Sequence, residues 1–146
     1  MAPFIVQWEI PATSRDQVIT QLVSTAAAHG RVHAIEPVVQ EVMAREQAGS
    51  TGFGQGFAIP HGKSDAVQEP TVLFARLASP VDWQALDGQP VQFVFLILVP
   101  NTGSQEHLRM LAILARKLMH PEFVQDIRQA TSPEALEAVL HRELIQ

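Results

Sequence analysis

A histidine between proline and glycine is the residue of this chain best suited to chemistry. In the segment Pro60-His61-Gly62, the proline fixes the backbone before the histidine, and the glycine allows another group to approach closely after it. The glycine-rich stretch 51–56 precedes this segment, which favours a surface loop over a packed core. The pattern predicts an exposed, reactive imidazole at His61. On these residues alone, a structural histidine remains the alternative.

A second histidine, His107, stands three residues after Ser104, in the first turn of a helix expected to follow an apolar strand. Clefts in α/β sheets lie at the carboxyl ends of strands, and the free amides of a helix N-terminus bind phosphate. A charged histidine is unfavourable beside the positive end of a helix dipole. Phosphate handling is one reason for a histidine there, and a neutral polar cap is the alternative.

The other four histidines have simpler explanations. His29 and His33 are four residues apart, but Gly30 lies between them and is expected to end a helix. No carboxylate completes a metal-ligand set around this pair, so no metal site is predicted. His29, His120 and His141 fall at or near predicted helix ends, where the helix dipole explains a histidine.

The segment Gly62-Lys63-Ser64 has the same residues as the end of a nucleotide-binding P-loop. That motif needs a glycine five residues before its second glycine, and Phe57 occupies that position. Gly56 is one residue too early, and Pro60 removes an amide N–H from the loop that must hold phosphate. A nucleotide site is therefore not predicted.

Length and composition indicate one globular domain, residues 1–146. Apolar residues make up 47% of the chain, which is enough for a buried core, and there is no cysteine for disulfides, thiolate metal sites or thiol chemistry. Ten basic against fifteen acidic residues give a net charge of −5, a poor basis for binding nucleic acid. The longest apolar run, Phe93–Val99, is far shorter than the about 20 residues that span a bilayer, and the N-terminus lacks the features of a signal peptide. We therefore expect a cytoplasmic protein without membrane insertion.

Hydrophobic periodicity predicts alternating strands and helices. An alternating strand, with Phe4, Val6, Trp8 and Ile10 on one face, is followed by two helices and then by strands that end with a buried central one. This order predicts an α/β domain with helices on both faces of its sheet. The expected elements are strands 4–10, 57–59, 71–77 (followed by a break at Ser79-Pro80) and 91–99, a helix from the Ser14 cap to Gly30, one from near Pro37 to Gly49, one from the Ser104 cap to His120-Pro121, and one that starts at Ser132.

Several of these segments together resemble a known family. From about residue 14 to the C-terminus, the chain is similar to the IIA domain of the bacterial phosphoenolpyruvate-dependent sugar phosphotransferase system, fructose/mannitol type. The segments that carry the resemblance are Arg45-Glu46, the run Ser50–Asp65, Asp82-Trp83 with Leu86-Asp87-Gly88, Phe95–Pro100, and His107-Leu108 with Leu111.

The resemblance implies a three-layer α/β/α fold with a mixed sheet and a phosphocarrier function. In such a relay the carrier protein HPr, phosphorylated on its own histidine, passes the phosphoryl group to a histidine of IIA. IIA passes it to a IIB domain, and a IIC membrane domain moves the sugar. The matching positions are His61 as the phosphorylated residue, with Nε2 as the attacking atom, and His107 and Arg45 as residues that stabilise the phosphate. One ring nitrogen must be unprotonated to attack, so the other is expected to donate its hydrogen to a fixed acceptor. No cofactor or metal is implied.

The resemblance leaves the substrate and the biological role open. Asp82-Trp83 and Leu86-Asp87-Gly88 look most like the fructose branch, but another hexose, a hexitol or a pentitol fits as well. The chain carries no IIB-, IIC- or HPr-like extension, so we expect its partners to act in trans. Some IIA-like proteins instead regulate other proteins according to their phosphorylation state, and the same histidine would serve both roles.

Around His61 we expect a shallow, apolar docking surface in an acidic setting, because two partners must reach one imidazole in turn. Phe53 and Phe57 are candidates for its rim, with a core position as the alternative for Phe57. The interface is expected to lie below about 1,200 Å², and the net charge of −5 to make association with a basic partner fall with added salt. Asp65 and Glu69 are close enough in sequence to act as a base and orienting pair for His61, although a solvated acidic loop fits them better.

Overall fold

A mixed six-stranded sheet forms the centre of the computed structural model, which describes residues 4–102 and 104–144, without the side chains of residues 104 and 106–108. The strand order is β1-β5-β6-β3-β2, and β4 pairs with β6 beyond the end of β3. β1 is parallel to β5, β3 and β4 are parallel to β6, and the β5–β6 and β2–β3 pairs are antiparallel. The strands are β1 (Phe4–Ile10), β2 (Gly52–Gly54), β3 (Phe57–Ala58), β4 (His61–Lys63), β5 (Thr71–Val81) and β6 (Val91–Val99).

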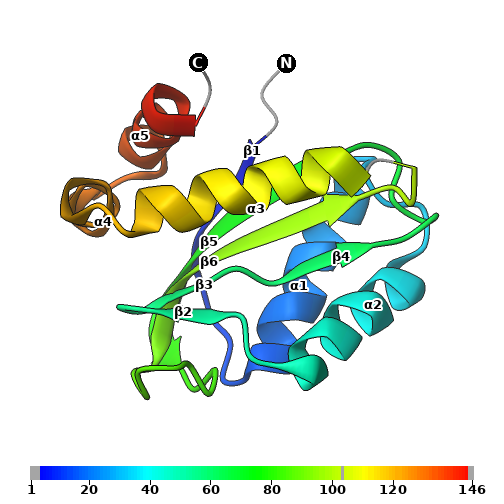
Figure 1. Cartoon of the computed structure of the whole chain (residues 1–146), viewed down its shortest axis with the longest axis horizontal. Helices are drawn as coiled ribbons and strands as arrows, with labels where there is room; N and C mark the ends of the chain where they lie inside the picture. Colours follow the sequence, from blue (N-terminus) through cyan, green and yellow to red (C-terminus); the bar gives the residue numbers. More distant parts are fainter. Residues whose placement is uncertain (1–3, 103, 145–146) are drawn as a thin grey trace.

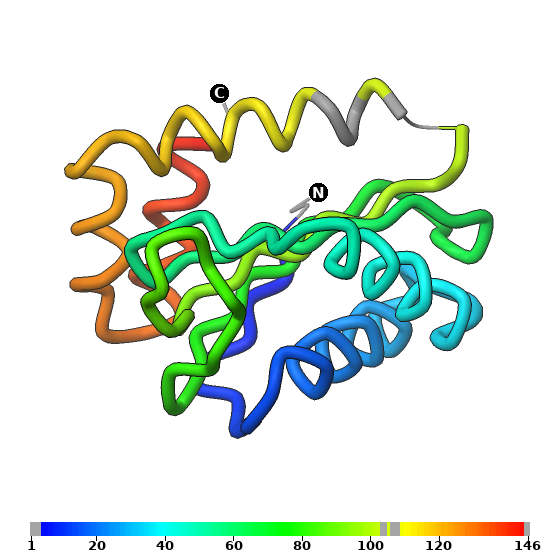
Figure 2. The backbone as a smooth tube through the Cα atoms, turned by 60° about the horizontal axis from the view of Figure 1, so that its bottom comes forward, coloured from blue at the N-terminus to red at the C-terminus, as the bar shows by residue number. Residues whose placement is uncertain are grey.

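Helices cover both faces of this sheet (Figure 1). In Figure 2, α3 lies above the sheet, and α1 and α2 lie below it. The helices are α1 (Arg15–Ala28), α2 (Ile35–Ala48), α3 (Ser104–Leu118), α4 (Pro121–Gln129) and α5 (Pro133–Leu144). The prediction of a three-layer α/β/α fold with a mixed sheet is confirmed. Among the described residues, no helix is long and apolar enough to cross a membrane.

Strand β6 explains why both layers are needed. Its side chains alternate between two buried clusters, with Leu96 and Leu98 facing α1 and α2, and Phe95 and Ile97 facing the layer of α3, α4 and α5. All four are at most 1% exposed. A strand that is apolar on both faces removes its side chains from water only when helices pack on each face.

Two of the predicted helix starts, at Ser14 and Ser132, are confirmed, and each has a side-chain cap. The Oγ of Ser14 accepts a hydrogen bond from the amide of Gln17 (3.2 Å), and the Oγ of Ser132 accepts one from the amide of Ala135 (3.1 Å). Helix α2 begins at Ile35, two residues before Pro37. Proline is tolerated there because the first turn of a helix leaves its amides without intrahelical partners.

Two strand predictions were wrong in detail. β5 continues through Ser79-Pro80 to Val81, with a shift in its register against β6 between Arg76 and Val81. Ile10 packs on the α1–α2 side, opposite to Phe4, because the register of β1 also shifts after Trp8, where Glu9 has φ +57°. Such irregularities displace the chain by a residue and reverse the face that follows.

Helix α4 was not predicted. The pair His120-Pro121 was expected only to end or kink the preceding helix, but Pro121 is the first residue of a new helix. This is a favourable position for proline. The residues that α4 buries, Phe123, Val124 and Ile127, have the helical spacing that would have revealed it.

Gly62 allows α2 to approach β4 closely. A Cβ at Gly62 would lie 2.7 Å from Cγ2 of Val42, a fully buried residue of α2. We expect Gly62→Ala to lower the free energy of unfolding by about 1–3 kcal/mol through overpacking. We expect the pair Gly62→Ala/Val42→Ala to lose less than the sum of the two single substitutions, because the second removes the clashing methyl group. Urea unfolding of the three variants measures this coupling, and additive losses would contradict the packing argument.

Candidate functional site

His61 is the first residue of β4 and lies at the sheet edge opposite to β1. Its backbone pairs in parallel with Ile97 of the central strand, and its side chain is half-buried. The predicted exposed loop at this position is therefore wrong in part, because the segment is a short strand and the imidazole is only partly accessible. The same pairing excludes a P-loop here, since Gly62 and Lys63 continue the strand.

The backbone next to His61 sets its tautomer. Nδ1 of the imidazole lies 2.9 Å from the carbonyl oxygen of Ile59. A carbonyl oxygen only accepts hydrogen bonds, so Nδ1 carries the hydrogen and, in the neutral ring, Nε2 carries the lone pair. The expected fixed acceptor is thus present, and it is a main-chain carbonyl two residues earlier in the chain.

The surroundings of His61 favour the neutral ring. Burial lowers the pKa of His61 below its ordinary value of 6.5, although the hydrogen bond to Ile59 opposes this shift. The positive charge of Arg45 lowers the pKa further, and the negative charge of Glu46 raises it. A neutral imidazole with a lone pair on Nε2 is a nucleophile near neutral pH.

Arg45 comes from the last turn of α2, on the helical layer next to β4. Its Nη1 donates a hydrogen bond of 2.7 Å to the carbonyl oxygen of Gly49, just past the end of the helix. This bond ties down one side of an otherwise exposed guanidinium. A planar guanidinium held in this way can offer further N–H groups to an anion.

A pocket of about 440 Å³ joins His61 and Arg45. It lies at the sheet edge, where residues from both helical layers reach the same strands. The positive and nucleophilic groups are thus set in a largely apolar wall. The other residues that line the pocket are Ser50, Thr51, Gly52, Phe53, Ile59, Leu86, Leu111 and Ala115.

Leu86 lies at the rim of this pocket, a position that its sequence context did not predict. Its side chain is 88% exposed, and it belongs to the connection between β5 and β6. Gly52 allows this connection to pack against β2, because a Cβ at Gly52 would lie only 2.7 Å from Cα and Cβ of Ala85. Single exposed apolar side chains are common on protein surfaces, so what distinguishes Leu86 is its position in the lining of the His61 pocket.

The turn between β2 and β3 is held from two sides. The amide of Gln55 donates to the Asp87 carboxylate (2.9 Å), and this bond holds the pKa of Asp87 below its ordinary range. The carbonyl oxygen of Gln55 accepts from Arg128 of α4, whose guanidinium also lies over the ring of Phe57. Both contacts fix the hairpin that carries Phe53 into the pocket wall.

The two predicted rim phenylalanines have different positions. Phe53 lines the pocket, as predicted. Phe57 does not belong to the rim, because it is 1% exposed and stacks on Phe93 with 4.9 Å between ring centroids. The alternating pattern of β3 places Phe57 in the core, and the glycines around it do not change that.

Other predicted residues lie away from the imidazole of His61 or outside the description. The Asp65 carboxylate accepts from Nδ2 of Asn101 (2.8 Å), and Glu69 lies 3.9 Å from Arg31, so a base and orienting pair for His61 was the wrong alternative. Residue 107 belongs to α3, four and eight residues before the pocket residues Leu111 and Ala115, but the side chain of His107 lies outside the described residues.

Two of the remaining histidines contact backbone carbonyls. Nδ1 of His29 lies 2.9 Å from the carbonyl oxygen of Thr25, and Nε2 of His33 lies 3.1 Å from that of Asp65. Across the described side chains, no three histidine or acidic residues are grouped so that they could hold a metal ion.

The pKa of His61 tests this arrangement. We expect NMR titration to give a midpoint below 6.5, and Arg45→Gln to raise it, because that substitution removes a nearby positive charge.

The lowered pKa of His61 also makes the stability of the fold depend on pH. Between the folded and unfolded pKa values, the unfolded chain binds more protons. The stability that His61 contributes is therefore present above pH 6.5 and is lost as the pH falls through the lower, folded pKa. A titration midpoint at or above 6.5 would contradict the conclusion that the surroundings of His61 favour the neutral ring.

Comparisons with known proteins identify the family of this chain. Residues 4–143 match a family model described as phosphoenolpyruvate-dependent sugar phosphotransferase system, EIIA 2. The chain is 37% identical to the PTS system fructose-specific EIIA component of Haloferax volcanii, over 93% of this chain and 88% of that protein. It is 38% identical to the PTS system fructose-like EIIA component of Escherichia coli, over 87% and 85% of the two chains.

A solved structure extends the comparison to the fold. The crystal structure of nitrogen regulatory protein IIA-Ntr from Neisseria meningitidis superposes with a TM-score of 0.83 at 33% identity, covering 93% of this chain and 92% of that one. The family match covers almost the whole chain, and the overall fold agrees with that of the solved structure. The chain therefore belongs to the EIIA 2 family of the phosphoenolpyruvate-dependent sugar phosphotransferase system and is a phosphotransferase component.

Proposed function

We propose that this protein is a cytoplasmic phosphocarrier that accepts a phosphoryl group from phospho-HPr on Nε2 of His61 and passes it to a IIB domain. The observation that carries the proposal is the hydrogen bond from Nδ1 of His61 to the carbonyl of Ile59 (2.9 Å). It leaves the lone pair on the other nitrogen of a half-buried ring whose pKa is lowered. A relay needs an accessible nucleophile of this kind.

The same hydrogen bond suits both directions of transfer. When Nε2 attacks, the P–N bond of the donor histidine breaks, a new P–N bond forms at His61, and Nδ1 keeps its hydrogen toward Ile59. The phosphorylated ring is then an imidazolium, whose charge the carbonyl dipole stabilises. When the acceptor on IIB attacks phosphorus, His61 leaves as a neutral imidazole with its electron pair returned to Nε2. The proton on Nδ1 need not move in either step.

Arg45 and His107 have supporting roles in this proposal. The transferring phosphoryl group passes through a loose transition state that needs positioning and positive or donor groups more than covalent help. Arg45 lines the same pocket as His61 and would offer guanidinium N–H groups to the phosphoryl oxygens. We propose that His107, from the first turn of α3, adds a further donor.

Fructose or a fructose-like sugar is the proposed cargo of the system. The support is the similarity to the fructose-specific and fructose-like EIIA components. In this scheme the sugar is bound by a separate IIC membrane domain, so the pocket beside His61 recognises protein partners only.

A regulatory role is the second candidate, because the chain is also 33% identical to a nitrogen regulatory protein of the same fold. The two candidates differ in where the phosphoryl group goes. Mixing the phosphorylated protein with a fructose-type IIB domain and following loss of the label tests this: transfer supports the sugar pathway, and a label that stays on the protein supports regulation.

Replacing His61 tests the proposed acceptor. With phosphoenolpyruvate, enzyme I and HPr, we expect the intact protein to gain the mass of one phosphoryl group, as an acid-labile, base-stable adduct. His61→Ala should gain none, because the nucleophile is absent. His33→Ala is the matched control, since His33 also binds a backbone carbonyl but lies outside the pocket. Normal labelling of His61→Ala, or a phosphosite at His107, would reject the assignment.

Replacing Leu86 tests the docking surface. We expect Leu86→Ser to raise the KM for phospho-HPr by about tenfold, since an apolar anchor at an interface contributes roughly 1–2 kcal/mol. The kcat should change little, because Leu86 does not touch the imidazole nitrogens in this scheme. Met119→Ser is the control, because Met119 is also highly exposed (75%) but does not line the pocket. Equal effects of the two substitutions would contradict a docking role for Leu86.

A further inference from the structure

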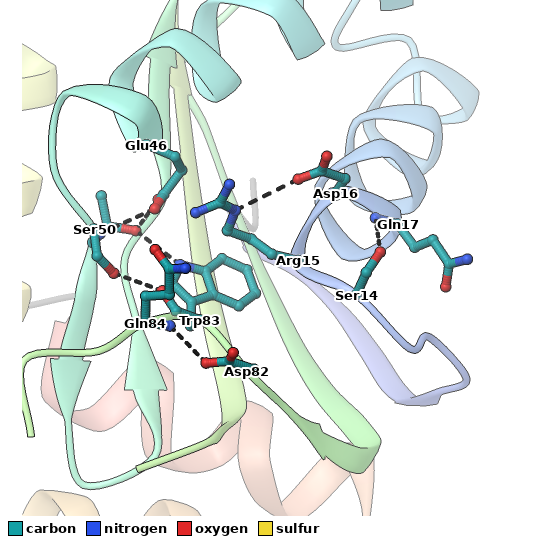
Figure 3. A network of polar contacts seen from close by, with 10 residues as sticks. Ser14, Arg15, Asp16, Gln17, Glu46, Ser50, Asp82, Trp83 and Gln84 are labelled. Atoms are coloured by element: carbon teal, nitrogen blue, oxygen red, sulfur yellow. Dashed lines mark hydrogen bonds and ion pairs between the residues drawn. The ribbon is translucent and has the colours of Figure 1, made fainter. Parts of the chain in front are cut away.

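A buried polar cluster adjoins the pocket, and one of its members, Thr51, is part of the pocket lining. Its members are Glu46, Thr51 and Trp83, which are 3%, 9% and 0% exposed. The hydroxyl of Thr51 donates to the Glu46 carboxylate and accepts from Nε1 of Trp83 (3.3 Å), and the amide of Thr51 donates to the same carboxylate (3.1 Å). In Figure 3, Glu46 from α2 and the indole of Trp83 approach one another beside Ser50, whose Oγ donates to the carbonyl of Trp83 (2.8 Å).

This cluster continues to the reactive ring through the backbone. The carbonyl of Thr51 accepts a hydrogen bond from the amide of Ile59 (3.0 Å), and the carbonyl of Ile59 accepts from Nδ1 of His61 (2.9 Å). The Ile59 peptides thus link the side chains that hold Thr51 to the hydrogen bond that fixes the His61 tautomer.

The cluster also contacts the chain segment that holds Arg45, which lines the same pocket. Glu46 follows Arg45 directly, and its carbonyl accepts from the amide of Gly49, whose own carbonyl anchors the Arg45 guanidinium. One buried threonine therefore connects the end of α2 with the strand segment that orients the nucleophile. If Thr51 served stability alone, it would need only to pair with the buried Glu46 carboxylate. The further contacts of Thr51 with the segment that orients His61 go beyond that need.

We propose that Thr51 is a positioning residue, which through its hydroxyl and backbone keeps the Ile59 carbonyl aligned with Nδ1 of His61. This inference rests on the proposed function, because it assigns a role within the transfer step. The tautomer of His61 can nevertheless be measured without any transfer, so the two proposals can fail separately.

The test compares Thr51→Val, which keeps the shape but removes the hydroxyl, with Thr51→Ser, which restores it. Thr71→Val is the matched control: Thr71 is 1% exposed, its hydroxyl donates to the carbonyl of Glu69 and accepts from Arg31, and it lies across β6 from His61. Glu46→Gln is a second way to weaken the contacts that hold Thr51, because an amide keeps only one of the two acceptor oxygens that Thr51 uses.

For Thr51→Val, we expect the kcat of phosphoryl acceptance to fall by about tenfold or more with KM for phospho-HPr little changed, since small misalignments cost this much. The ¹⁵N shifts of the neutral His61 ring should move away from the Nδ1–H tautomer. Thr51→Ser should restore both values, Glu46→Gln should move the tautomer in the same direction, and Thr71→Val should leave both unchanged at equal folded fraction.

Two outcomes would overturn the inference: a native tautomer and rate in Thr51→Val, or the same changes in Thr71→Val. If Thr51→Val does not fold, the tautomer in Glu46→Gln decides. If the unsubstituted protein accepts no phosphoryl group, the proposed function fails, while the tautomer measurements still test the positioning role.

Discussion

The hydrogen bond between Nδ1 of His61 and the carbonyl of Ile59 (2.9 Å) is the contact on which the proposed chemistry of this site depends. A free histidine exchanges between two tautomers, and only the one protonated at Nδ1 keeps the lone pair on Nε2. A main-chain acceptor two residues earlier selects that tautomer without a second titrating group. The backbone geometry therefore determines which nitrogen of the proposed nucleophile carries the lone pair, and this requires the backbone around residues 59–61 to be held firmly.

The sheet supplies that rigidity at one of its edges. His61 pairs with Ile97 of β6, and the close approach of α2 at Gly62 holds β4 from below. The side chain of Leu111 from α3 reaches the same pocket from the opposite layer, beside Arg45 from α2. An edge strand between two helical layers can thus bring groups from both layers together and still keep one side open to a partner.

Sequence patterns predicted the layers, the central strand and the two capped helix starts, because apolar periodicity and capping chemistry are local. They failed where the outcome depends on contacts far apart in the chain. Leu86 reaches the pocket rim only because Gly52 admits Ala85, and Phe57 is buried by stacking on Phe93. The carbonyl of Ile59 was not predicted either, since every residue has one and its use depends on conformation.

The imidazole of His61 is subject to two opposing demands, desolvation and access for a partner. Desolvation lowers the pKa of His61 and keeps the ring neutral, but complete burial would close it to the large partners of a relay. A half-buried imidazole in an apolar wall satisfies both demands, because one nitrogen is engaged by the backbone while the ring still borders a pocket. In the proposed relay, a partner that docks over the exposed Leu86 would complete the desolvation, and the electrostatic stabilisation proposed for Arg45 would then be strongest when donor or acceptor is in place.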